Sequence, residues 1–261
     1  MKKIPQDIIG DIAILKFPLT DSLKSKKLKS KEFLKNHPNV KTVLEKTNKF
    51  SGRLRIQKTK YLAGEKTTKA VYRENDCTFK FDIDKTYFSP RLSEERKRTA
   101  QDISKLLKKK HTKLLVMFSG IAPFPVVIAK KLRKEKKDFH IIAVELNKEA
   151  NRFAKENISL NKLSKDITLI QKDVKIFAKN LKATFDIIVM TRPNLKDTFL
   201  KEALKLSKRK TTIFYHGFGT KDSVLKEIKE NTKGKIGKIQ IRRAGDIAIG
   251  KWRWLARFKV K

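Results

Sequence analysis

The sequence predicts an α/β fold, in which most of the chain forms a mainly parallel sheet wrapped by helices. From Ser93 onward, short apolar runs alternate with segments of helical periodicity. Repeated strand–helix units of this kind fold into parallel sheets covered by helices. The final two apolar segments have no helix between them, which indicates an antiparallel edge on that sheet.

The first part of the chain predicts a separate, smaller α+β unit. Residues 8–17 are typical of a turn and a strand, and residues 22–36 of a basic surface helix. Further strands are expected at 40–47, 53–62, 69–75 and 77–83. We expect no crossover helix in this half and a boundary around residues 85–95. The predicted domains are therefore 1–90 and 91–261.

The second domain is expected to begin with a helix. Ala100, Ile103 and Leu107 recur at helical spacing, and Glu94 and Glu95 lie in the first turn, where the helix dipole favours acids. Strands are then expected at 114–118, 139–145, 167–171, 185–190, 211–218, 236–242 and 251–260. The helices between them are expected at 124–134, 148–161, 194–207 and 223–232.

The charge balance indicates an anionic partner. The chain has 65 Lys and Arg residues against 27 Asp and Glu, a formal net charge of +38. A compact domain with this charge repels itself unless an anion offsets it, and nucleic acid is the commonest such partner. Lysine-rich usage across a whole proteome would also contribute, and the even spread of the charge argues against every Lys being a contact.

The remaining composition predicts the compartment. The single Cys, Cys77, excludes an internal disulfide framework and fits a reducing environment. No apolar run approaches the roughly 18 residues of a membrane span. The start of the chain lacks the features of a signal peptide. We therefore expect a cytoplasmic, monomeric protein without membrane association.

Candidate binding residues lie where the predicted parallel strands end, because open sheets bind ligands beyond the carboxyl ends of their strands. Gly120 follows the first strand and lets backbone approach a ligand. Glu145 ends the second strand, where a carboxylate can accept both ribose hydroxyls of a nucleoside. Asp173 follows the third strand and can receive an adenine amino group. Residues 191–193, Thr-Arg-Pro, end the fourth.

Each of these residues also has a purely structural interpretation. Glu145 can be a solvated acid, Asp173 a turn former and the Gly120 loop a plain turn. Their joint placement on successive strand ends favours a binding site. The sequence has no G-x-G-x-x-G and no G-K-[ST], which disfavours a dinucleotide or a triphosphate. A small adenosine cofactor, S-adenosylmethionine, fits better, and we predict no metal site.

Seven segments, in order along nearly the whole chain, resemble the archaeal–eukaryotic tRNA guanine-37 N1-methyltransferases. They are DIIGDIAILKF, RLRIQKTKYLAGE, FKFDIDKTYFSPRLSEER, MFSGIAPF, AVELNKEA, ENISLNKL and the strand leading to MTRP. The resemblance implies a class I (Rossmann-like) S-adenosylmethionine-dependent methyltransferase domain preceded by a small α+β RNA-binding domain. It also implies tRNA as partner, held by its anticodon stem-loop. Relatives often carry a further N-terminal domain, which we expect this chain to lack.

The resemblance also assigns roles to residues by position. Glu95 matches the proposed general base and Arg55 the arginine that assists it. The cofactor-binding residues that it implies are Tyr87, Arg96, Phe118, Gly120, Glu145, Leu146, Asp173, Val174, Thr191 and Pro193.

These residue types suit the implied reaction. N1 of guanine bears a proton at neutral pH, and a carboxylate can remove it as the methyl group arrives in line. Negative charge then grows towards O6, where an arginine is useful. The base must leave the stacked anticodon loop to react, which suits a basic cleft between two domains.

Three positions depart from the family pattern. The family has an acid where Val116 stands, a glycine where Ala122 stands, and Asn-Leu-Pro where this chain has Thr-Arg-Pro at 191–193. We expect these changes to affect cofactor affinity and Arg192 to add positive charge near the target. Two alternatives stay open: a wybutosine-pathway aminocarboxypropyl transferase acting on the same nucleotide, and a non-catalytic RNA-binding relative.

Overall fold

The computed structural model describes residues 5–47, 56–107, 111–248 and 250–261. The chain divides into two compact units, Met1–Pro90 and Arg91–Lys261. No helix in the described part of the chain is long and apolar enough to span a membrane.

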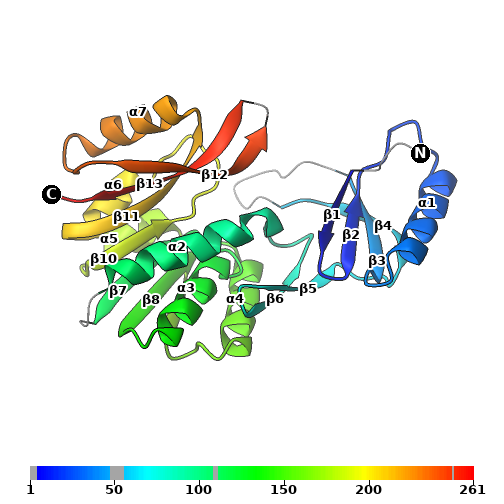
Figure 1. The fold of residues 1–261 in the computed structure, drawn as a ribbon, viewed down its shortest axis with the longest axis horizontal. Helices are drawn as coiled ribbons and strands as arrows, with labels where there is room; N and C mark the ends of the chain where they lie inside the picture. Colours follow the sequence, from blue (N-terminus) through cyan, green and yellow to red (C-terminus); the bar gives the residue numbers. More distant parts are fainter. Residues whose placement is uncertain (1–4, 48–55, 108–110, 249) are drawn as a thin grey trace. The chain divides into compact units, whose positions relative to one another are not determined.

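The first unit contains a four-stranded sheet and a separate two-stranded hairpin (Figure 1). The sheet order is β1-β2-β3-β4, formed by Gln6–Ile9, Ile12–Leu15, Thr42–Lys46 and Thr59–Gly64. The hairpin pairs β5 (Lys69–Glu74) with β6 (Cys77–Asp82). The short β1 was not expected as a strand of its own, because only four residues form it.

Helix α1 (Leu23–Asn36) connects β2 to β3, which run parallel. Parallel neighbours need a crossover connection, so the expectation of no crossover helix in this half was wrong. The lysine-rich sequence of α1 hid this role, because few of its side chains face the sheet. Phe33 and Leu34 pack on the sheet core, and Ser30 is fully buried.

The second unit is an α/β domain with a seven-stranded sheet in the order β12-β13-β11-β10-β7-β8-β9. The strands are β7 Thr112–Met117, β8 Phe139–Glu145, β9 Ile167–Gln171, β10 Phe185–Met190, β11 Ser207–Gly219, β12 Gln240–Ala248 and β13 Lys251–Lys259. Strands β7 to β11 are parallel neighbours, while β13 pairs antiparallel with β11 and β12. The predicted parallel sheet with an antiparallel edge is therefore confirmed.

Helices cover both faces of this sheet (Figure 1). They are α2 Ser93–Leu106, α3 Pro123–Lys134, α4 Lys148–Leu160, α5 Val174–Asn180, α6 Leu200–Lys205 and α7 Lys221–Thr232. The core beneath α5, α6 and α7 includes Met117, Met190 and Tyr215. Because strand residues alternate between faces, Val116, Val189 and His216 point to the opposite face.

Two helices differ from the sequence prediction. Helix α5 was missed, since it has only seven residues and follows directly on the capping Asp173. Helix α6 is much shorter than the predicted 194–207, because the carbonyls of Leu195 and Asp197 accept hydrogen bonds from the Arg192 guanidinium. A helix over these residues would need those carbonyls for its own hydrogen bonds.

The strand order reverses between β7 and β10. From β7 the chain builds outward through β8 and β9, and then returns to the other side of β7 with β10. A crevice at the carboxyl ends of such strands is where open α/β sheets bind ligands. The residues that follow β7, β8, β9 and β10 meet at this edge.

Candidate cofactor and catalytic site

The loop after β7 has an unusual backbone. Phe118, Gly120 and Ala122 have φ values of 63°, 55° and 67°, so three of five successive residues are left-handed. Left-handed backbone costs an alanine roughly 1–2 kcal/mol relative to right-handed, which explains why glycine suits position 122. Strain of this kind gathers at ligand-binding loops. The Ser119 hydroxyl is buried and has no hydrogen-bond partner in the described part of the chain.

Glu145 ties this loop to the end of β8. One carboxylate oxygen accepts from the backbone N–H of Gly120 at 2.8 Å, and the other from that of Asn147, also at 2.8 Å. Burial raises the pKa of the Glu145 carboxyl, and the backbone N–H groups counteract this only in part. A carboxylate has about four lone-pair sites, so ribose hydroxyls can still donate to these oxygens.

Three asparagines of α4 and its cap support the same region, and sequence reasoning missed them. Asn147 caps α4 by accepting from the backbone N–H of Glu149 at 2.9 Å. Asn151 donates to the Glu145 carbonyl at 2.9 Å, and Asn157 donates to the Ile121 carbonyl at 3.0 Å. Buried asparagines spaced along one helix face, in the segment that matches the family, were the signal that was available.

The residues that follow β8 and β9 differ in their exposure and in their hydrogen bonds. Leu146 is 38% exposed, whereas Val174 is buried in the core under α5. Asp173 is the N-cap of α5 and accepts from the Lys175 N–H at 2.7 Å. The structural interpretation of Asp173 as a cap therefore holds, and a role in binding adenine would come in addition to it.

Thr191 and Arg192, at the end of β10, turn in different directions. The Thr191 hydroxyl lies 3.0 Å from the Met117 carbonyl and 2.9 Å from that of Phe118, which fastens β10 to the β7 loop. Arg192 is 2% exposed, and its guanidinium donates to the His216 carbonyl at 3.1 Å and to Glu227 at 2.8 Å. The expectation of added charge near the target is wrong, because this charge is buried and paired.

The Val116 side chain is fully buried between Ala143 of β8 and Val189 of β10. The place of the family's acid is therefore filled by packed apolar groups. The rest of the edge fits an adenosine cofactor: a left-handed glycine loop, a carboxylate at the end of β8 and an acid after β9. These residues would hold the ribose and the adenine. Val116 has no polar side-chain atom that could bind the methionine end of the cofactor.

Glu95 lies in the first turn of α2 and is 6% exposed. Thr99 donates to its carboxylate at 2.9 Å. Both terminal nitrogens of Arg242, on β12, donate to its two oxygens, one of them at 3.0 Å. Burial by itself raises the pKa of the Glu95 carboxyl, but the facing His216 ring and the hydrogen-bonded, charged Arg242 guanidinium outweigh it and hold the pKa below its usual value.

His216, on β11, faces the same carboxylate. Its ring is fully buried, and Nε2 lies 3.7 Å from the nearer oxygen of Glu95. Nδ1 lies 3.4 Å from a guanidinium nitrogen of Arg253. Arginine can only donate, so Nδ1 accepts and the neutral ring carries its proton on Nε2, directed at Glu95. Burial lowers the pKa of His216, which keeps the ring neutral.

The sequence analysis did not single out Arg242, His216 or Arg253. His216 is the one ionisable imidazole within the strand sequence TTIFYHGF, directly after the apolar Ile-Phe-Tyr, and that was the available signal. Among the predicted residues of this unit, Arg96 is 1% exposed, with its guanidinium 6.0 Å from the Phe124 ring. Phe124 in turn lies edge-on to His216 at 5.5 Å. The start of α3 thus connects the cofactor loop to the Glu95 cluster.

Three further predicted residues complete the set. Arg55 is outside the described residues. Tyr87 belongs to the first unit, after β6, and is partly buried. Pro193 follows Arg192 at the end of β10 and is partly buried. The roles assigned to these residues stay predictions. No cluster of metal-ligating side chains is found among the described residues.

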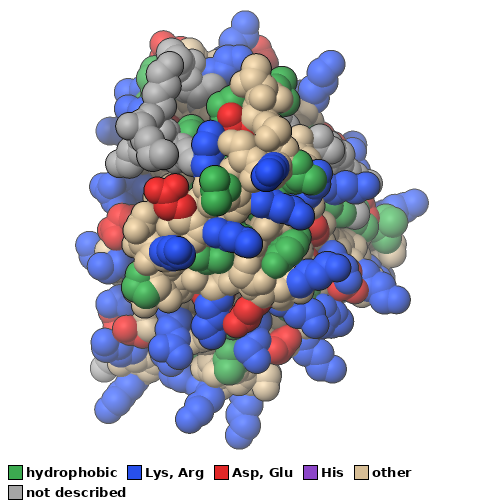
Figure 2. Space-filling model, turned by 90° about the vertical axis from the view of Figure 1, so that its right-hand side faces the viewer, with side chains coloured by type: hydrophobic (Ala, Val, Ile, Leu, Met, Phe, Trp, Pro, Cys, Tyr) green, Lys and Arg blue, Asp and Glu red, His purple; other side chains and the backbone are tan. Residues whose placement is uncertain are grey.

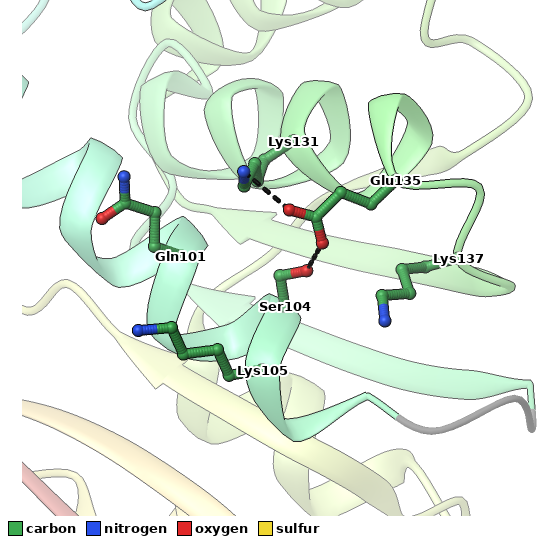
Figure 3. A pocket seen from close by; sticks show the side chains of 6 residues that line it. All are labelled: Gln101, Ser104, Lys105, Lys131, Glu135 and Lys137. Atoms are coloured by element: carbon green, nitrogen blue, oxygen red, sulfur yellow. Dashed lines mark hydrogen bonds and ion pairs between the residues drawn. The ribbon is translucent and has the colours of Figure 1, made fainter.

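A pocket of about 480 Å³ lies between the last turns of α2 and α3 (Figure 3). Gln101, Ser104, Lys105, Lys131, Glu135 and Lys137 line it. Glu135 accepts from the Ser104 hydroxyl and pairs with Lys131 at 2.6 Å. Since α2 leads into β7 and α3 into β8, the pocket lies near the amino ends of the strands. It contains none of the candidate site residues and is not the cofactor site.

A family model described as the TRM5/TYW2 methyltransferase domain matches residues 70–241, and one described as the TYW2 N-terminal domain matches residues 4–67. The chain belongs to the TRM5/TYW2 methyltransferase family. The family is S-adenosylmethionine-dependent. The resemblance and the fold class inferred from the sequence are therefore confirmed.

Three curated relatives show the range within the family. The tRNA (guanine(37)-N(1))/4-demethylwyosine(37)-methyltransferase Taw22 of Nanoarchaeum equitans is 42% identical, covering 62% of this chain and 50% of the relative. Trm5b of Pyrococcus abyssi is 32% identical, covering 82% and 59%. The tRNA(Phe) (4-demethylwyosine(37)-C(7)) aminocarboxypropyltransferase of Methanocaldococcus jannaschii is 30% identical, covering 80% and 76%. The chain thus spans half to three-fifths of the first two relatives.

A solved structure of aTrm5 in complex with tRNALeu matches the fold closely. Its TM-score is 0.84 at 26% identity, covering 99% of this chain and 72% of the other. The match extends over both units of the chain.

Proposed function

We propose that the protein transfers the methyl group of S-adenosylmethionine to N1 of guanosine 37 of tRNA. The observation that carries this proposal is Glu95, a buried carboxylate held ionised at the cofactor edge of the sheet. A protein that only binds RNA has no need of such a group. A methyl transfer to a protonated ring nitrogen needs a base there.

The cofactor, when bound, supplies a methyl group on a positively charged sulfur. Gly120, Glu145 and Asp173 would hold its adenosine part, and the bound cofactor would supply the methyl group to the target nitrogen. Glu95 accepts the N1 proton, and the electron pair of that N–H bond becomes available at N1. Arg55 is proposed to stabilise the negative charge that grows on O6.

The partner proposal draws on charge. Figure 2 shows lysine and arginine side chains across the visible face, with fewer acidic ones between them. On α1, the inward Lys26 and Lys29 pair with Glu45 and Asp21. Four other lysines of α1 are exposed and lie within one narrow stripe of the helix: Lys24, Lys27, Lys31 and Lys35. Such a stripe can follow the phosphates of an anticodon stem.

This partner proposal is tested by changing all four stripe lysines to Gln and measuring tRNA affinity against salt. Each lost phosphate contact should lower the slope of log affinity against log salt by about 0.7–0.9. The matched control changes four exposed lysines of α7 and its C-cap to Gln: Lys221, Lys226, Lys229 and Lys233. Equal losses in both variants would mean that α1 adds only general charge.

Aminocarboxypropyl transfer is the second candidate function. Two observations favour it: the chain covers 76% of the Methanocaldococcus jannaschii aminocarboxypropyltransferase, and Thr191 and Arg192 replace the Asn-Leu of the N1-methyltransferases. It moves a different group from the same cofactor. Methylation of 4-demethylwyosine is a related possibility suggested by the Taw22 relative.

The deciding experiment is mass spectrometry of nucleosides from tRNA incubated with the protein and S-adenosylmethionine. Unmodified tRNA and tRNA carrying 4-demethylwyosine are compared in parallel. A gain of one methyl group on guanosine, located at position 37 after nuclease digestion, supports the proposal. A gain of an aminocarboxypropyl group on the second substrate alone would replace it.

Calorimetric titration with S-adenosylmethionine tests the methyltransferase and aminocarboxypropyltransferase hypotheses together, because both need this cofactor. Saturable binding that depends on Glu145 is expected. No detectable binding would leave the non-catalytic RNA-binding alternative.

A further inference from the structure

Arg242 closes over the proposed base. Its side chain is 21% exposed while that of Glu95 is 5% exposed, and the guanidinium occupies both oxygens of the carboxylate. A guanine that gives its N1 proton to Glu95 needs one of those oxygens. The ion pair therefore has to open before the base can act.

The same ion pair weakens Glu95 as a base. A neighbouring guanidinium favours the ionised carboxylate over the protonated one. At the moment of proton transfer, Glu95 has to become protonated, and an attached Arg242 opposes that change. An enzyme with this geometry gains if Arg242 leaves as guanine arrives.

A second acceptor for Arg242 is already in place. Asp102, two turns further along α2, lies 3.6 Å from the Arg242 guanidinium and is 29% exposed. Arg242 also lies on β12, an edge strand of the sheet whose register shifts just after it, between Arg243 and Gly245. Bulged edge strands are where proteins re-aim side chains beside active sites.

We propose that Arg242 is a positioning residue that pairs with Glu95 in the free enzyme and passes to Asp102 when guanine occupies Glu95. The inference rests on the proposed role of Glu95 as the base. The other groups around the carboxylate stay fixed: His216 on β11 directs its Nε2 proton at Glu95, with Arg253 of β13 behind it, and Thr99 donates from α2. Arg242 has two carboxylates within reach, those of Glu95 and Asp102.

The first measurement needs no turnover. The carboxyl ¹³C resonance of Glu95, assigned by its loss in Glu95→Gln, is followed against pH in the free protein. Arg242→Gln should raise the pKa of Glu95, because its cation is gone. Asp102→Asn should leave it unchanged or lower it, because Arg242 then has one acceptor. An unmoved resonance in Arg242→Gln would overturn the pairing, whatever product the enzyme makes.

The second measurement is a double-mutant cycle on single-turnover rates. Asp102→Asn should slow the chemical step about tenfold, a coupling typical of residues in one network. In the Arg242→Gln background, Asp102→Asn should change nothing, since no arginine remains to be moved. Additive losses would show that the two side chains act separately, and would contradict the movement of Arg242 from Glu95 to Asp102.

The pH profile separates positioning from a structural role. The acidic limb of the rate should move to higher pH in Arg242→Gln, while the plateau is kept. A uniform loss at every pH would contradict the proposal. Arg242→Lys keeps the charge without the two-pronged contact and serves if Arg242→Gln does not fold. Arg243→Gln is the matched control, since that neighbour pairs with the exposed Asp246.

Discussion

Two carboxylates at one edge of the sheet, the half-buried Glu145 and the buried Glu95, have opposite pKa shifts. Glu145 accepts hydrogen bonds from neutral backbone N–H groups, and burial raises its pKa. Glu95 is the more deeply buried of the two, but a guanidinium and an imidazole N–H face it, and its pKa is lowered. Burial alone therefore does not set the direction of the pKa shift here. The charge of the hydrogen-bond donors that face each carboxylate decides it.

This difference matches two different tasks. A carboxylate that orders a loop and receives hydroxyl groups works through the hydrogen bonds it accepts, and neutral donors suffice for that. A carboxylate that removes a proton has to be ionised before the substrate arrives. The Arg242 cation beside Glu95 provides this, and under the proposal above it also weakens Glu95 as a base until Arg242 moves.

The largest expected effect is on the chemical step. Glu95→Gln should lower the single-turnover rate about 10²–10⁴-fold, because an amide cannot accept the N1 proton. tRNA affinity should be retained, as Gln keeps the size of the side chain. Glu94→Gln, the exposed neighbour in the same helical turn, should have wild-type rates. Near-normal turnover in Glu95→Gln would show that the base is another group.

The next effect concerns the other carboxylate and should fall on cofactor binding. Glu145→Gln removes charged hydrogen bonds worth about 1.5–3 kcal/mol each, so S-adenosylmethionine affinity should fall about 10- to 100-fold by calorimetry. The chemical step at saturating cofactor should change much less. Glu149→Gln in the same segment, whose side chain pairs with Arg152, is the control. If rate rather than affinity fell in Glu145→Gln, the two carboxylates would not divide the work in this way.

The two carboxylates also show what sequence alone can supply. The position of Glu145 follows from local alternation, because a strand end is visible within a few residues. The partners of Glu95 are not local: Arg242 is 147 residues away along the chain. Only the antiparallel return of β12 brings it to α2, and no short pattern records that. The electrostatics of Glu95 were therefore beyond prediction, although its place in the first turn of α2 was not.

Misread helices have a similar origin. The 194–207 segment has helical character in sequence, but the Arg192 guanidinium takes two of its carbonyls. A tertiary hydrogen bond overrides local propensity there. In α1 the local pattern hid a tertiary contact. Its many lysines suggested a helix on the surface, but Phe33 and Leu34 pack it against the sheet.

Stability against pH should register the lowered pKa of Glu95. The ionised form is stabilised by folding, so its contribution is present above the ordinary value of 4.5 and is lost as pH falls below it. Each unit of lowering contributes about 1.4 kcal/mol. Urea unfolding of wild type and Glu95→Gln between acid and neutral pH should show a difference that shrinks in acid. A pH-independent difference would mean that the cations around Glu95 do not lower its pKa.

The smallest effect concerns the loop that holds Glu145. Ala122 has a φ of 67°, so Ala122→Gly should relieve left-handed strain of about 1 kcal/mol. A gain of that size raises the melting temperature about 2–4 °C in a unit of this length. Ala129→Gly, inside α3, should instead cost about 1 kcal/mol, because glycine weakens a helix. If both substitutions destabilised the protein, Ala122 would carry no strain. If only Ala122→Gly stabilised it, cofactor affinity measured on that variant would show whether the strained loop or Glu145 alone governs binding.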